Sequence, residues 1–98
     1  MKTFRDLQFK LNDGWGIMAR MPFDNGFQLS VVAGKVAYSK PREYNSDPSF
    51  YKLFEVAVFG PDGEFTREFF PEDHYDDVMG WQERGQINAL MLLVQSKK

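Results

Sequence analysis

Apolar and polar side chains alternate with a period of two along the first third of the chain. In residues 6–11, Leu7, Phe9 and Leu11 fall at every second position, between polar neighbours. Because successive side chains of a β-strand point to opposite faces of its sheet, this pattern predicts a half-buried strand. The next residues, Asn-Asp-Gly at 12–14, are those that tight turns use.

The same period predicts two further strands, joined by a hairpin. The first covers residues 15–21; the second starts at Phe27, bends at Gly34 and continues to Tyr38. The Asn-Gly pair at 25–26 is a strong hairpin signal, because both residue types tolerate positive φ. The side chains expected to face the core are Trp15, Ile17, Ala19, Met21, Phe27, Leu29, Val31 and Ala33.

A fourth strand is predicted over residues 50–59, which are apolar at both odd and even positions. Such a strand is typical of the centre of a sheet that is covered on both faces. It follows an irregular connection, residues 40–49, and precedes a Gly-Pro-Asp-Gly turn at residues 60–63. Alternation in residues 64–70 predicts a fifth strand, which Pro71 ends.

An amphipathic helix, beginning near Glu83–Arg84, is predicted to close the chain. The apolar residues that follow the 3.6-residue period of a helix face are Ile87, Leu90, Met91 and Val94. Leu92 and Leu93 widen this face, so we expect the helix to be well buried. Trp81 is expected to pack in the core just ahead of the helix.

Five strands followed by one helix, without strand–helix alternation, predict an α+β fold. The expected architecture is a mainly antiparallel sheet of about five strands with the C-terminal helix packed on it. The length of 98 residues allows a single domain, residues 1–98. A composition of 43% hydrophobic and 27% charged residues is that of an ordinary folded chain.

The residue types that the chain lacks exclude several kinds of site. It has no cysteine, which excludes disulfides, thiolate metal ligands and a cysteine nucleophile. His74, its one histidine, stands near Asp73 and Asp76, an arrangement that suggests a general base or, more simply, a polar loop. No catalytic, calcium-binding or phosphate-binding spacing is complete. We therefore expect no enzyme activity, no metal and no cofactor.

The net charge of −2 hides an uneven distribution, +3 over residues 1–54 and −5 over residues 55–98. Two interpretations of the acidic segment stay open: a solvated strand edge and loop, or a surface that binds a basic partner. The acidic balance argues against direct binding of nucleic acid, which needs clustered Lys and Arg. The carboxylates of this candidate acidic face are Asp62, Glu64, Glu68, Glu72, Asp73, Asp76 and Asp77.

A second candidate surface places cations between aromatic residues within ten positions. Proteins that bind single-stranded nucleic acid use aromatic platforms of this kind, though with a longer basic groove. The alternatives are therefore the end of a strand with its loop, or an interaction surface for a partner. The residues of this basic-aromatic patch are Lys35, Tyr38, Lys40, Arg42 and Tyr44.

A series of short motifs runs through the half of the chain that begins at Tyr51. The motifs are Phe54-Glu55-Val56-Ala57-Val58, Asp62-Gly63, Asp76-Asp77-Val78-Met79-Gly80-Trp81 and Ile87-Asn88-Ala89-Leu90-Met91. In this order they resemble a group of small proteins encoded by bacteriophages and prophages. The resemblance implies a small α+β protein, and some phage proteins of this kind are anti-CRISPR or other anti-defence proteins that act by occupying a host surface. The first turn of the helix, Gly85-Gln86, departs from the Glu-rich turn of that group.

We expect an inhibitor of a host defence complex that binds a host protein, such as a Cas protein, in the bacterial cytoplasm without catalysis. Cas proteins hold nucleic acid in basic channels, for which clustered carboxylates can compete. One alternative is a self-associating module, such as a homodimer, that uses Phe23, Phe50 and Phe70 as exposed aromatics. Another is a small-molecule or nucleotide-binding sponge with a pocket between helix and sheet. No apolar run approaches the roughly 20 residues of a membrane span, so no membrane partner is expected.

Overall fold

The strands lie in the order β1-β2-β3-β4-β5, and each neighbouring pair is antiparallel. The computed structural model describes residues 1–98. A sixth strand, β6, pairs with β4 on the same edge as β5. The strands are β1 (Lys10–Asn12), β2 (Gly16–Pro22), β3 (Gln28–Gly34), β4 (Phe54–Phe59), β5 (Phe65–Thr66) and β6 (Val78–Gln82).

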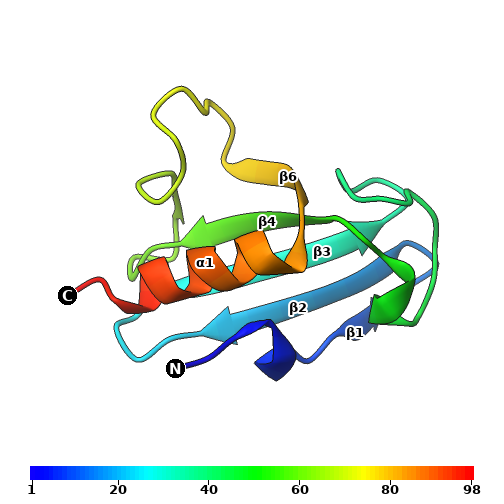
Figure 1. Cartoon of the computed structure of the whole chain (residues 1–98), viewed down its shortest axis with the longest axis horizontal. Helices are drawn as coiled ribbons and strands as arrows, with labels where there is room; N and C mark the ends of the chain where they lie inside the picture. The colour runs from blue at the N-terminus through cyan, green and yellow to red at the C-terminus, as the bar shows by residue number, and fades with distance from the viewer.

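One helix, α1 (Arg84–Gln95), crosses one face of this sheet (Figure 1). Ile87, Met91 and Val94 are fully buried, and together with the inward side chains of β2, β3 and β4 they form the core. The expected α+β fold, with an antiparallel sheet and a C-terminal helix, is confirmed. No helix of the structure has both the length and the apolarity that a membrane crossing requires.

The helix is less deeply buried than its leucines suggest. Leu92 and Leu93 are 46% and 53% exposed, and Leu90 is only partly buried. Because α1 lies on the outside of the sheet, it can bury one stripe of side chains and leaves the next stripe in solvent. The expectation that Leu92 and Leu93 are buried is therefore wrong.

The N-terminal segment forms a 3-10 turn, η1 (Phe4–Asp6), before a short edge strand, β1. The Asp6 carboxylate accepts a hydrogen bond from the Thr3 backbone N–H at 2.8 Å, which closes the turn and lowers the pKa of Asp6. The Phe4 N–H donates to Asn88 Oδ1 on α1 at 2.7 Å. The strand expected over residues 6–11 therefore begins only at Lys10, because Asp6 belongs to η1 and residues 7–9 are irregular. Leu7 is buried as expected, whereas Leu11 is 60% exposed.

Three other strands differ from the sequence-based expectations. β3 ends at Gly34 and does not reach Tyr38, because the buried Ser39 hydroxyl accepts the Gly34 N–H and folds the chain back. β4 is central, as expected, but it starts at Phe54, and α1 covers only one of its faces. The fifth strand shrinks to the two residues of β5. Residues 78–82, expected as a connector, form β6.

Two irregular segments carry the residues considered below. Residues 35–53 connect β3 to β4 and include a second 3-10 turn, η2 (Pro48–Phe50). The segment between β5 and β6, residues 67–77, rises away from the sheet (Figure 1). We call residues 67–77 the acidic loop.

Candidate functional site

A β-bulge in β6 determines where Trp81 points. Val56 pairs with Met79 and Phe54 with Gln82, so β6 carries one more residue than β4 over the same length. Trp81 lies in this bulge with φ of 59°, and it is the one residue besides glycine with positive φ. For a bulky residue this left-handed conformation costs on the order of 1–3 kcal/mol. The indole is 49% exposed, so the expectation of a core Trp81 is wrong.

Tyr38 packs against the bulge and fixes its position. Its carbonyl accepts the Trp81 N–H at 2.8 Å, and the two rings lie 6.1 Å apart between centroids, with 37° between their planes. A Cβ atom at Gly80 would overlap the Tyr38 side chain, so only glycine allows this approach. Tyr38 is itself 44% exposed. Two large aromatic rings are thus held together at the surface.

Arg42 completes this cluster from the connection between β3 and β4. Its guanidinium lies 5.6 Å from the centroid of the Tyr38 ring, within cation–π range. The buried Tyr51 holds the same connection, because its hydroxyl accepts the Asn45 N–H at 2.9 Å and donates to the Glu43 carbonyl. We call Tyr38, Arg42 and Trp81 the aromatic platform.

The basic-aromatic patch expected from the sequence is therefore divided. Tyr38 and Arg42 belong to the aromatic platform, whereas Lys40 lines a separate hollow of about 510 Å³ with Lys52 and the start of α1. Lys35 and Tyr44 line neither this hollow nor the groove described below. Sequence reasoning missed Trp81 as a member, although the Gly80-Trp81 pair beside a predicted helix start is a signal for a local irregularity.

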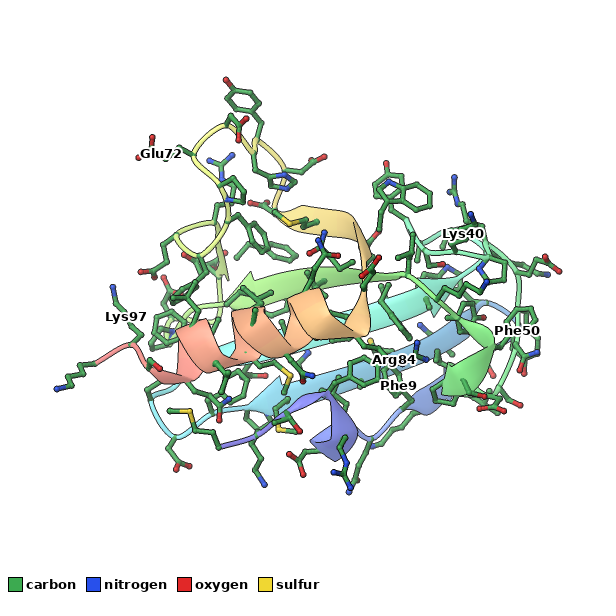
Figure 2. The ribbon with its side chains drawn as sticks, viewed as in Figure 1. Phe9, Lys40, Phe50, Glu72, Arg84 and Lys97 are labelled. Atoms are coloured by element: carbon green, nitrogen blue, oxygen red, sulfur yellow. The ribbon has the colours of Figure 1, made fainter.

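The seven expected carboxylates likewise do not form one continuous face. Asp62 accepts the Glu64 N–H within the β4–β5 turn at 3.0 Å, and Glu68 forms a 2.8 Å ion pair with Lys97 beyond α1. Figure 2 shows Glu72 on the outward-projecting acidic loop and Lys97 at a different place, past the end of α1. The other four carboxylates, Glu72, Asp73, Asp76 and Asp77, lie within six residues of one another in the second half of the acidic loop.

His74 holds the acidic loop against β6. Its Nε2 lies 2.7 Å from the Val78 carbonyl oxygen, to which it must donate, and its ring meets Phe70 edge-on at 5.2 Å. Arg67 donates to the Tyr75 carbonyl and lies 4.0 Å from an Asp77 oxygen. These contacts give His74 a structural role in positioning the loop. No cluster of three or more histidine and carboxylate side chains is arranged to hold a metal ion.

A groove of about 470 Å³ is lined by residues of both the aromatic platform and the acidic loop. The groove brings together parts of both candidate surfaces, because Tyr38 and Arg42 come from one and Asp76 from the other. It can receive a side chain that is partly apolar and partly charged. Its lining also includes the β6 residues Val78, Met79 and Gly80, along with His74 and Trp81.

The aromatics expected for self-association are mostly not available. Phe23 and Phe70 are each only 8% exposed, because both pack into the core, while Phe50 is 37% exposed. Directly under α1 the core is filled. The hollow nearest to the expected pocket, about 370 Å³, lies at the edge of α1 against Phe69, Phe70 and Met79.

Comparison with known proteins adds no family to this geometry. Neither the protein-family models, nor the curated proteins, nor the solved structures contain a match to this chain.

Proposed function

We propose that the protein is a non-catalytic binding protein that occupies a surface of a partner protein through the aromatic platform. The observation that carries the proposal is the exposed indole of Trp81, held outward by a left-handed backbone that a tryptophan adopts only at a cost. If this position had no binding role, glycine would adopt the left-handed conformation of the bulge at a lower cost in free energy than tryptophan does.

The chemistry of the platform supports this role. Trp, Tyr and Arg are the residue types that most often dominate the binding energy of protein–protein interfaces. Trp81 and Tyr38 present the two aromatic types to a partner, while Arg42 stacks on the Tyr38 ring. The hydrogen bond between the Trp81 N–H and the Tyr38 carbonyl fixes the backbone that carries the two rings before binding. A surface that is already ordered loses less conformational entropy when it binds.

The acidic loop supplies the rim of the proposed interface. Its carboxylates at Glu72, Asp73 and Asp76 form no ion pair within the chain. Rim charges speed association and disfavour wrong partners, whereas they add little to the stability of the fold. The partner surface is therefore basic around the point where the platform docks.

The resemblance to phage-encoded proteins gives the proposal its specific form. In that form the partner belongs to a host defence complex, such as a Cas protein, and the chain inhibits it by surface occupation in the bacterial cytoplasm. The basic channels in which Cas proteins hold nucleic acid match the charge of the acidic loop. The proposal involves no cofactor and no direct contact with nucleic acid.

The test compares capture of proteins from a bacterial lysate by the wild-type chain and by Trp81→Asn. Asparagine tolerates positive φ, so the bulge survives the substitution. The matched control is Phe65→Ala, which removes an aromatic of similar exposure, 47%, in β5. Bound proteins are identified by mass spectrometry.

The expected result is a protein retained by the wild type and by Phe65→Ala and lost by Trp81→Asn. Equal retention by all three chains would contradict the platform as the working surface. Capture of only this same chain would replace the proposal with self-association.

A further inference from the structure

The lining of the groove includes an exposed aromatic ring that has no cation over it. Elsewhere the chain repeatedly stacks cations on its rings: Arg20 lies 4.4 Å from the centroid of Phe59, and Arg84 lies 5.1 Å from that of Phe54. Arg42 does the same at Tyr38. The indole of Trp81, the strongest cation acceptor among the aromatic side chains, has no such partner within the chain.

The groove lining also includes a carboxylate without a partner. Asp76 is exposed and forms neither an ion pair nor a side-chain hydrogen bond. Asp73 and Glu72 add further negative charge on the same loop. The one cationic side chain in the lining is Arg42, and the His74 ring donates its hydrogen bond to the Val78 carbonyl. The loop side of the groove therefore attracts positive charge.

We infer that the groove lined by Trp81 and Asp76 receives a cationic side chain of the partner, with arginine favoured over lysine. A guanidinium can stack on the indole and donate hydrogen bonds to the carboxylate at the same time, because it is planar and carries five donors. Lysine offers a single, more strongly hydrated charge. This inference rests on the proposed function and names the partner group that the platform recognises.

Arg42 makes the sign of the ligand charge testable. Its guanidinium repels a cationic guest and attracts an anionic one, so its removal separates the two classes of ligand. Asp76 provides the converse variant. Asp73 provides the matched control, because Asp73→Asn changes the net charge equally but removes a carboxylate that does not line the groove.

The experiment is an NMR titration of the ¹⁵N-labelled chain with the capped peptide acetyl-Gly-Arg-Gly-amide. Its citrulline counterpart, which is nearly isosteric and neutral, is the control ligand. We expect the signals of the Trp81 indole and of the amides of residues 76–81 to shift when the arginine peptide is added. The same signals should not move when the citrulline peptide is added. Asp76→Asn should weaken binding by about two- to fivefold, the range of an exposed charge contact. Asp73→Asn should weaken it less, and Arg42→Ala should strengthen it.

Three results would overturn the inference: no shift at the groove, equal shifts with the citrulline peptide, or weaker binding by Arg42→Ala. The last would show that Arg42 helps to hold the guest instead of repelling its charge. The proposed function fails separately, since it depends on capture of a partner by the wild type but not by Trp81→Asn. If Trp81→Asn no longer captures the partner but the wild type does not bind the arginine peptide, the proposed contact surface stands. Only the inference that it receives an arginine side chain is then wrong.

Discussion

The backbone N–H of Trp81 donates a hydrogen bond to the carbonyl of Tyr38 across 2.8 Å. This bond joins β6 to the segment that follows β3, two parts of the chain that are far apart in sequence. The Tyr38 side chain also covers the position where Gly80 would carry a Cβ atom. The Trp81–Tyr38 hydrogen bond and the close approach of Tyr38 to Gly80 therefore both hold the two rings of the aromatic platform in place.

We expect Gly80→Ala to destabilise the protein by about 1–3 kcal/mol, the usual cost of an extra methyl group without space. Tyr38 would have to move, and the Trp81–Tyr38 hydrogen bond would stretch. The control is Gly85→Ala in the first turn of α1, where nothing lies near the added methyl group, and which should stabilise by up to about 1 kcal/mol. Urea unfolding of both variants measures the difference. A Gly80→Ala protein as stable as the wild type would show that Tyr38 can move aside for the added methyl group without cost.

Trp81→Asn should change the free energy of unfolding by less than about 1 kcal/mol. Relief of the left-handed strain, about 1–2 kcal/mol, largely offsets the lost contact with the exposed Tyr38 ring, about 0.5–1.5 kcal/mol. Thermal unfolding followed by circular dichroism checks this. A loss of several kcal/mol would mean that Trp81 serves the fold and would weaken its assignment to binding.

Tyr51→Phe should destabilise by about 1–2 kcal/mol, because the Asn45 N–H and the Glu43 carbonyl lose their partner. Burial also raises the pKa of Tyr51 above its ordinary value of 10.0. Its contribution to stability is therefore fully present below pH 10 and is lost as the pH rises through the folded-state pKa. Unfolding measured from pH 8 to 11.5 should show this alkaline loss in the wild type and less of it in Tyr51→Phe. Tyr44→Phe, with a 41% exposed ring, should behave as the wild type does.

Within α1, Met91→Ala should cost about 2–5 kcal/mol, whereas Leu93→Ala should cost less than about 1 kcal/mol. Met91 is fully buried and Leu93 is 53% exposed, so only the first leaves a cavity. Chemical denaturation of the two variants tests which side of the helix faces the sheet. Similar losses would indicate that Leu93 is covered in solution, for example by a second copy.

The regular part of the fold could be predicted because its patterns are local. Strict alternation placed Ile17, Ala19, Leu29 and Val31 in the core. The 3.6-residue period placed Ile87, Met91 and Val94 on the side of the helix that faces the sheet. Leu92 and Leu93 follow the same apolar pattern yet lie in solvent. Periodicity gives the direction of a side chain but not how much of the helix surface the sheet can cover.

The candidate site could be predicted only in part, because it depends on contacts between distant segments. Tyr38 and Arg42 belonged to a predicted patch, but their meeting with Trp81 depends on the bulge in β6, which no alternating pattern reveals. The acidic residues were predicted as one face from their closeness in sequence. The turn at Asp62 and the Glu68–Lys97 ion pair separate them in space.

Reversing the charge of Glu72, Asp73, Asp76 and Asp77 to Lys should abolish binding of a basic partner and leave the fold intact. These side chains are exposed, so they contribute little to stability. Binding by the wild type should also weaken as salt rises, because exposed charges are screened over about 8–10 Å at ordinary ionic strength. The affinity for the partner and the melting temperature are both measured on this fourfold variant and compared with those of the wild type. Retained binding would remove the acidic loop from the interface.

The most direct test of the account is the footprint of the captured partner on this chain. Hydroxyl-radical labelling read by mass spectrometry compares side-chain accessibility in the free protein and in the complex. We expect strong protection of Tyr38 and Trp81 in the complex and none of Phe65, which lies in β5 outside the groove. Protection of Phe65, with Tyr38 and Trp81 as accessible as in the free protein, would contradict the platform as the site of binding.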